Sequence, residues 1–390
     1  MLETLKYLKG DRVIWVVSML LGLLSILAVY SSIVTLAYKY QGGNTEYFLI
    51  KHGIMLVTGF LLMFYAHKLK FKYYSRLSQI GIWLAIFLLI LTLAVGANIN
   101  HASRWLVIPV INQNFQTSDF AKIALIAFVA RQLSVHRDGL HDFKLVATKI
   151  LLPIGAVCLL IFPANFSTAA LLFFTCFVLL FIGRVPLKYL GATLGGIVLL
   201  VSILLLIAKG SPDTLPRLAT WQKRITSFEA GGAEANYQAE HAKIAIATGG
   251  LTGKGPSKGS SRNYLPHPYS DMIYAFIIEE YGSLIGGVGV LLLYLILLFR
   301  SVKVSVKCPS HFGSYLAIGL SLSLVFQAMI NMGVAVGLLP VTGQPLPLVS
   351  MGGTSIWFTC ITIGIILSVS RSIVDEEEVE TKKGGQYATA

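Results

Sequence analysis

Residues 13–35, VIWVVSMLLGLLSILAVYSSIVT, form an apolar run that contains no charged side chain. A helix needs about 20 such residues to cross the hydrocarbon core of a bilayer. The run is too long for the apolar region of a signal peptide, and no small-residue cleavage site follows it. We therefore expect a membrane-spanning helix that also serves as the insertion signal.

The same kind of window recurs along the rest of the chain. Hydrophobic residues make up 55% of the 390 residues and charged residues only 13%, and the mean hydropathy is +0.73. A soluble domain of this length needs far more polar surface to cover its core. The sequence therefore predicts an all-α polytopic integral membrane protein with about ten transmembrane helices. Beyond the first run, the predicted spans are 48–66, 77–97, 118–134, 147–163, 168–183, 187–208, 271–299, 312–337 and 353–370.

Lysine and arginine gather in alternate connections between these spans. The basic stretches are 6–12, 68–76, 131–149, 184–188, 300–307 and the residues from 371 onward. Because cytoplasmic loops carry the excess of these residues, we expect this side and both termini to be cytoplasmic, with the chain in the cytoplasmic (inner) membrane. The same pattern accounts for most of the net charge of +13, which in a soluble protein would suggest nucleic-acid binding. The extracytoplasmic segments are then 36–47, 98–117, 164–167, 209–270 and 338–352.

We expect one transmembrane domain over residues 1–372, with a large extracytoplasmic loop at 209–270 between the seventh and eighth spans. Residues 373–390 begin with an acidic run and end polar, which predicts a disordered cytoplasmic tail. The cysteines have no metal-ligand spacing, and no disulfide framework is expected. They are Cys158, Cys176, Cys308 and Cys360.

The large outer loop is rich in basic side chains, among them Arg224, Lys243 and Lys254. Two interpretations stay open, because such charges in a long loop are either merely solvated or bind an anionic ligand at the outer surface. Residues 248–256, TGGLTGKGP, are rich in glycine. Without the flanking strand and helix of a nucleotide-binding loop, they are only a weak indication of phosphate binding.

Acidic side chains mark the start of the eighth span. Asp271 suits an ordinary helix cap, and it equally suits a base that acts on a lipid-linked substrate at the rim of the bilayer. Glu279 and Glu280 follow inside the span, where acidic groups are costly and need a partner or a cavity. A structural ion pair and a transport pathway both account for these two glutamates.

Two further segments border the outer side. Asp119 and Lys122 lie three residues apart on one face of the fourth span, which predicts a salt bridge, and the preceding Arg104-Trp105 suits an interfacial anchor. Residues 337–355, GLLPVTGQPLPLVSMGGTS, contain three prolines and four glycines. This composition predicts a rigid re-entrant loop, which is tolerated at membrane depth only inside protein or along a cavity.

Several activities have no support in the sequence. The chain shows no Ser/His/Asp arrangement, no metal-ligand cluster, no Walker motif and no dinucleotide fingerprint. We therefore do not expect ATP-driven transport from this chain.

In combination these motifs resemble the SEDS family (shape, elongation, division and sporulation) over roughly residues 10–372, and look most like its cell-division branch. The Arg104-Trp105 pair and 115–122, FQTSDFAK, resemble the family's R-W and F-Q-P-S-E-x-A-K. The other matching segments are PANFSTA at 163–169, GGLTGKG at 249–255, YLP at 264–266 with Ser270-Asp271, EEYG at 279–282, and 337–355. They occur in the family's order and on the expected sides of the membrane.

The resemblance implies a peptidoglycan glycosyltransferase that polymerises lipid II, an undecaprenyl-diphosphate-linked disaccharide-peptide, outside the cytoplasmic membrane. It also implies a class B penicillin-binding transpeptidase and other division proteins as partners, a location at the division septum, and no nucleic acid. In the family, the aspartate at the position of Asp271 is the essential catalytic residue.

The implied reaction sets what the site must supply. A sugar hydroxyl is a poor nucleophile without a base, and the leaving diphosphate needs basic side chains or a divalent cation such as Mg or Mn. We expect no tightly bound cofactor and assign no metal ligands. The candidate substrate-binding residues are Arg104, Asp119, Lys122, Arg224, Gln238, Lys243, Lys254, Ser350 and Ser355, with Glu279 and Glu280 as supporting polar groups.

The chain departs from the family pattern at two notable positions. Asp119 stands for a glutamate, and Asn165 stands for an aspartate, so no charge role carries over to Asn165.

Three other functions stay open: a lipid II flippase that would use Glu279, Glu280 and Lys122, an elongation-type glycosyltransferase, and a scaffold that only recruits a transpeptidase.

Overall fold

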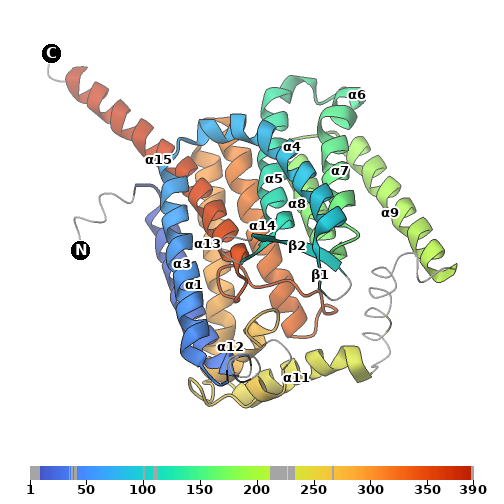
Figure 1. The fold of residues 1–390 in the computed structure, drawn as a ribbon. Helices are drawn as coiled ribbons and strands as arrows, with labels where there is room; N and C mark the ends of the chain where they lie inside the picture. The colour runs from blue at the N-terminus through green and yellow to red at the C-terminus, as the bar shows by residue number, and fades with distance from the viewer. Residues whose placement is uncertain are drawn as a thin grey trace.

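The computed structural model describes residues 9–387, except 35, 37, 39–41, 100, 101, 109–112, 211–225, 227–232, 266 and 267. In this part of the chain every predicted span coincides with helix, and the helices form one bundle (Figure 1). Seven helical segments are long and apolar enough to cross a membrane, and two shorter apolar helices accompany them. The prediction of a helical multi-pass membrane protein is therefore confirmed.

The long apolar helices run up and down through the bundle (Figure 1). Two of the long segments contain a π-helical stretch, at Ala147–Leu151 and at Gly282–Gly289. The helices are α1 (Arg12–Ser32), α3 (Thr45–Lys68), α4 (Phe71–Val95), α5 (Thr117–Val135), α6 (Phe143–Val146), α7 (Leu152–Ile161), α8 (Phe166–Ile182), α9 (Leu187–Gly210), α11 (Ala233–Gly249), α12 (Ile273–Tyr281), α13 (Val290–Lys307), α14 (His311–Ala335) and α15 (Thr354–Tyr387).

Helices α14 and α15 lie at the centre of the bundle. In their most apolar stretches 78% and 72% of the residues are buried, compared with 28% in α3 and in α4. Outward-facing side chains of α4 such as Ile80 and Trp83 are large and apolar, as expected for a surface in lipid. The central helices therefore carry the side chains that contact other protein segments.

Side-chain caps define the start of several helices. Asp11 accepts hydrogen bonds from the first N–H groups of α1, and Asn44 caps α3 in the same way. Asn165 caps α8 by accepting a bond from the N–H of Thr168 at 3.3 Å. Because asparagine and aspartate cap equally well, the departure from the family pattern at Asn165 preserves this local function.

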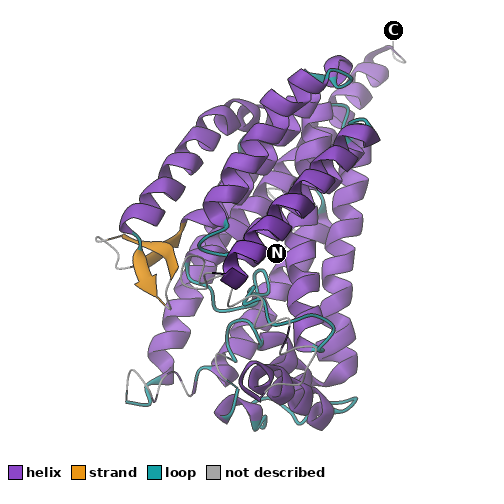
Figure 2. Ribbon diagram, turned by 90° about the vertical axis from the view of Figure 1, so that its right-hand side faces the viewer, coloured by secondary structure: helices purple, strands orange, loops and turns teal. Residues whose placement is uncertain are grey.

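The outer connection at 98–117, expected only as a loop, contains a small antiparallel sheet in the order β1 (Ala97–Ile99), β2 (Ala102–Ile108) and β3 (Gln113–Gln116). Trp105 pairs with Ala97 on one side and with Gln116 on the other. The sheet lies at one side of the bundle (Figure 2, orange). The hydroxyl of Thr354 at the start of α15 donates to the carbonyl of Asn114, which joins the sheet to the centre of the bundle.

The eighth predicted span is discontinuous. Gly282 ends α12 with φ +79° and ψ 167°, a left-handed conformation that favours glycine, and a π-helical stretch leads into α13. A Cβ at this position would collide with the backbone of Leu251 and Thr252, so the outer loop can approach α12 only at a glycine.

The C-terminal segment differs from the expectation of a disordered tail, because α15 continues as helix to Tyr387 and projects beyond the bundle (Figure 1). Asp375 also pairs with Lys9 at 2.8 Å, which places the start of the described chain beside α15.

Candidate active site

The segment between α14 and α15, predicted as a re-entrant loop and called by that name below, has irregular backbone that the surrounding helices hold. Four of its carbonyl groups accept hydrogen bonds from side chains of α1, α13 and α14. The pairs are Asn331 to Gln344 (2.8 Å), Gln327 to Pro345 (2.9 Å), Tyr294 to Pro347 (2.5 Å) and Ser25 to Val349 (2.7 Å). Irregular backbone inside a membrane protein needs such partners, so these side chains fix the path of the loop.

One residue of the loop has a strained backbone. Leu348, which is buried, has φ +65°, and a residue with a Cβ adopts this left-handed conformation at a cost of roughly 1–2 kcal/mol. The neighbouring carbonyl of Val349 is held by Ser25, whose hydroxyl lies 2.8 Å from Nε2 of buried His52. Because Ser25 uses its hydrogen for Val349, His52 must be the donor in that contact.

The re-entrant loop in turn holds the residues around Asp271. The hydroxyl of Ser350 donates to the carbonyl of Ser270 at 2.6 Å, and the N–H of Met351 donates to the carbonyl of Tyr269 at 2.9 Å. The amide of Asn331 donates to the carbonyl of Asp271 at 2.8 Å and also to the loop itself. Hydrogen bonds therefore fix the backbone around Asp271 at three successive carbonyl groups, those of residues 269–271.

Asp271 does not act as the cap that its position in the sequence suggested. The N-cap of α12 is Met272, and no side chain caps this helix. The Asp271 carboxyl instead lies beside the re-entrant loop, where a Cβ placed on Gly343 would be 4.0 Å from Oδ2. The residue is partly exposed, so a carboxylate stands at the junction of the outer loop and the re-entrant loop.

Asp119 and Lys122 form the predicted salt bridge at 2.8 Å, and both are largely buried. Lys122 also donates to Oε1 of Gln327 at 3.0 Å, while the amide nitrogen of Gln327 donates to the carbonyl of Pro345. A cavity of about 20 Å³, large enough for a single water, adjoins these side chains and Ser355. The pair is thus connected to the re-entrant loop through Gln327.

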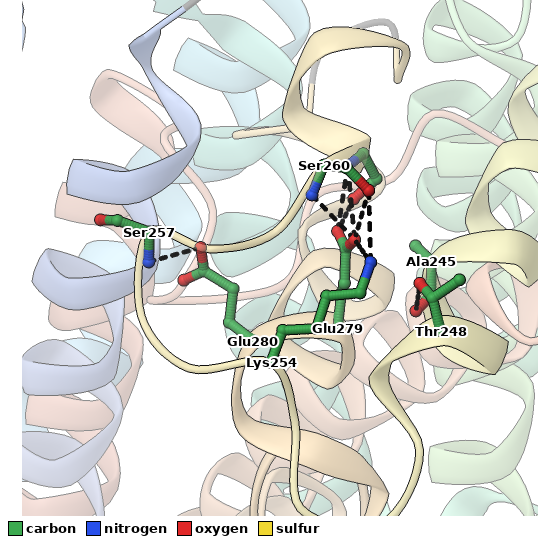
Figure 3. A network of polar contacts seen from close by, with 8 residues as sticks. Ala245, Thr248, Lys254, Ser257, Ser260, Glu279 and Glu280 are labelled. Atoms are coloured by element: carbon green, nitrogen blue, oxygen red, sulfur yellow. Dashed lines mark hydrogen bonds and ion pairs between the residues drawn. The ribbon is translucent and has the colours of Figure 1, made fainter.

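Glu279 and Glu280 bind the outer loop rather than one another (Figure 3). Glu279 forms an ion pair with Lys254 at 2.7 Å and accepts from the N–H of Ser260 at 2.9 Å and from the hydroxyl of Ser261. Glu280 accepts from the N–H of Ser257 at 2.9 Å and from the hydroxyl of Ser31 on α1. Both glutamates therefore anchor residues 254–261, while Oε2 of Glu280 is buried without a hydrogen-bond partner among the described residues.

The glycine-rich segment at 249–255 also packs against α12. Gly249 and Gly253 approach the backbone of α12 so closely that a Cβ on either would collide with it. The N–H groups of Lys254 and Gly255 donate to the carbonyls of Glu279 and Glu280, both at 2.9 Å. These N–H groups are thus already bonded, and the segment is not arranged as a phosphate cradle.

The remaining candidate residues belong to the segments predicted to be extracytoplasmic. On α11, Gln238 is partly buried, and Lys243 is exposed with its side chain against Gly337 at the start of the re-entrant loop. Arg104 belongs to β2, but its side chain lies outside the described part of the structure, as does Arg224 entirely. Of the basic candidates whose side chains the structure describes, Lys243 is the most exposed.

Sequence reasoning missed two connecting residues, Gln327 and Asn331. Both are amides four residues apart within an otherwise apolar predicted span, and both are almost fully buried. Polar side chains inside a span are costly and need a partner, which was the available signal. Their partners lie in segments that are distant in the sequence, so the signal did not show what they hold.

A preformed metal site made of protein ligands alone is not found in the described part of the structure. Among these residues, no three His, Cys, Asp or Glu side chains gather into a group that could hold a metal. Mg²⁺ is typically held by one or two carboxylates together with substrate phosphates, and Asp271 would supply one such carboxylate. No step below involves a metal ion.

Comparison with known proteins gives matches over almost the whole chain. The FtsW/RodA/SpoVE family model, described as "Cell cycle protein", matches residues 11–374. Stage V sporulation protein E of Bacillus subtilis is 30% identical over 379 residues, which cover 94% of this chain and 99% of that protein. The probable peptidoglycan glycosyltransferase FtsW of Legionella pneumophila is 31% identical over 369 residues, which cover 91% of this chain and 90% of that protein.

Solved structures share the architecture. A chain from the structure described as "Structural coordination of polymerization and crosslinking by a peptidoglycan synthase complex" has a TM-score of 0.71 and 25% identity, covering 93% of this chain and 98% of that chain. The rod shape determining protein RodA of Thermus thermophilus has a TM-score of 0.64 and 25% identity, covering 93% of this chain and 97% of that chain. The resemblance inferred from the motifs is confirmed, and the chain belongs to the FtsW/RodA/SpoVE family of cell cycle proteins.

Proposed function

We propose that this chain is a peptidoglycan glycosyltransferase that polymerises lipid II on the outer face of the cytoplasmic membrane. Membership of the family and the names of FtsW relatives support the reaction class. The observation that carries the proposal is the fixed position of Asp271, a partly exposed residue whose carboxylate lies at the junction of two outer segments.

In the proposed step, Asp271 removes the proton from a hydroxyl of the acceptor sugar. The oxygen attacks the anomeric carbon of the donor on the face opposite the diphosphate, a new glycosidic bond forms, and the bond to the lipid diphosphate breaks. The configuration inverts, and the departing diphosphate carries away the electron pair. A general base held in a fixed position typically accelerates such reactions 10²–10⁴-fold.

Basic side chains stabilise the leaving diphosphate in this proposal. Lys122 and Lys254 already bind Asp119 and Glu279, so they are less suited to this task than the exposed Lys243. Lys243 lies against Gly337, at the start of the loop whose later residues hold Asp271. We therefore assign the first diphosphate contact to Lys243, with preorganised positive charge as its contribution.

We further propose a role in septal wall synthesis, with a class B penicillin-binding transpeptidase and other division proteins as partners. The similarity to division-type relatives supports this, although the family also contains elongation-type members. Depletion of the protein in rod-shaped cells should yield filaments, whereas spheres would assign the chain to elongation.

The reaction itself is tested with purified protein and lipid II, with and without the cognate transpeptidase, using polymer length as the readout. Outward-facing lipid II in reconstituted vesicles must be polymerised, because this step requires no flipping. Movement of lipid II across the bilayer without polymer formation would identify a flippase instead. An exposed acid far from the site, changed in Asp138→Asn, provides the matched control and should leave polymerisation unchanged.

A further inference from the structure

A cavity of about 330 Å³ opens at the basic end of the bundle, between the start of α1, the end of α13 and α15. Buried apolar side chains such as Val304 and Ile373 line it together with cationic ones. The cationic residues are Arg12, Arg300, Lys303 and Lys307.

Two of these cations, Arg12 and Lys303, are not balanced by an ion pair within the described part of the protein. Asp11 is the single acidic residue among the lining residues, and it accepts from Arg300 at 2.6 and 2.9 Å. The same carboxylate also caps α1. Among the described residues, neither Arg12 nor Lys303 forms an ion pair, so like charges converge on a concave surface that an anion would stabilise.

The surroundings of the cavity suit a lipid better than a soluble anion. Helices α1 and α13 pack together, and apolar side chains beside the cavity are exposed: Val16 on α1, with Phe299 and Val306 on α13. Acyl chains can lie along these side chains while the headgroup occupies the cavity. The basic loops predict that this end is cytoplasmic, where anionic lipids give the membrane surface a negative potential.

We propose that this cavity binds the phosphate of an anionic phospholipid. Arg300, oriented by Asp11, presents a fixed guanidinium, and Arg12 and Lys303 complete the charge around the phosphate. The glycerol and first methylene groups contact Val13 and Val304, and the acyl chains continue into the bilayer. This site is independent of the proposed transferase reaction, because it lies at the other end of the α12–α13 segment from Asp271.

The test measures binding of phosphatidylglycerol and phosphatidylcholine to the full chain in detergent, by native mass spectrometry and by thermal stabilisation. In the double variant Arg12→Gln/Lys303→Gln, phosphatidylglycerol should bind about thirty-fold more weakly, and in Lys303→Gln alone about five-fold more weakly. Arg300 is left intact because it pairs with Asp11.

The control variant Lys144→Gln/Lys149→Gln removes two exposed charges of the same end, away from the cavity. It should keep the wild-type preference for phosphatidylglycerol. Equal affinity for both lipids would overturn the proposal, as would an equal loss in the control, which would indicate diffuse surface charge. Displacement of phosphatidylglycerol by inorganic phosphate at the same concentration would also overturn it, because the ligand would then be a soluble anion.

Discussion

Gln327 offers a sharp test of how the buried polar groups act on Asp271. Its amide nitrogen donates to the carbonyl of Pro345, and its oxygen accepts from Lys122. Gln327→Met keeps a similar length and volume but removes both hydrogen bonds. Gln132→Met, on the partly exposed surface of α5, is the matched control.

The size of the effect follows from what each partner loses. A buried carbonyl left without its donor costs about 1–3 kcal/mol, and a hydrogen bond to a charged group contributes about 1.5–3 kcal/mol. Lys122 keeps its ion pair with Asp119, so losing the hydrogen bond from Lys122 to Gln327 should cost a free energy at the low end of this range. If the loop moves to recover these bonds, Asp271 moves with it, and a shift of about 1 Å can cost roughly 100-fold in rate.

We therefore expect Gln327→Met to lower kcat by about 10–100-fold and to leave KM for lipid II within about two-fold. Steady-state polymerisation by this variant, by Lys122→Met and by the double variant measures the effect. Because Lys122 acts through Gln327, the double variant should be no slower than the slower single variant. A raised KM in Lys122→Met, with effects that multiply in the double variant, would refute this reasoning and place Lys122 on the substrate.

Three further predictions concern residues that hold the backbone or the outer loop in place. Ser350→Ala leaves the carbonyl of Ser270 without its donor, so the free energy of unfolding should fall by about 1–3 kcal/mol in thermal melts, and polymerisation should slow. Glu279→Gln should lower the melting temperature more than Lys254→Met, because Glu279 also accepts from Ser260 and Ser261; the reverse order would contradict its role as the anchor. Asn165→Asp keeps the cap of α8 and adds charge at a helix N-terminus, so stability should rise by about 0.3–1 kcal/mol with unchanged activity, and a loss of stability would speak against the cap.

The spans were predictable because each one is a local property of the sequence. An apolar run such as 13–35 must become a helix in lipid, whatever it contacts. The helical continuation of α15 was missed because its acidic composition resembles that of a disordered tail. The break at Gly282 was also missed, since a glycine inside an apolar window does not reveal that the outer loop packs against it.

The candidate site was only partly predictable. Asp271 and the re-entrant loop were found from position and composition, but their mutual contacts join residues far apart in the chain, such as Ser350 and Ser270. Charge alone places Lys122 and Lys254 among the substrate-binding candidates, whereas the structure gives each of them a protein partner. Spacing along one helix cannot distinguish a lysine that binds a ligand from one that holds another segment.

The central claim is that Asp271 acts as the base, and single-turnover polymerisation by Asp271→Asn tests it most directly. The variant keeps the size of the side chain and the backbone hydrogen bond from Asn331. We predict that it binds lipid II with wild-type affinity and forms bonds at least 100-fold more slowly, within the range of about 10²–10⁴-fold expected for loss of a base. Bond formation at the wild-type rate with bound lipid II would contradict this role for Asp271.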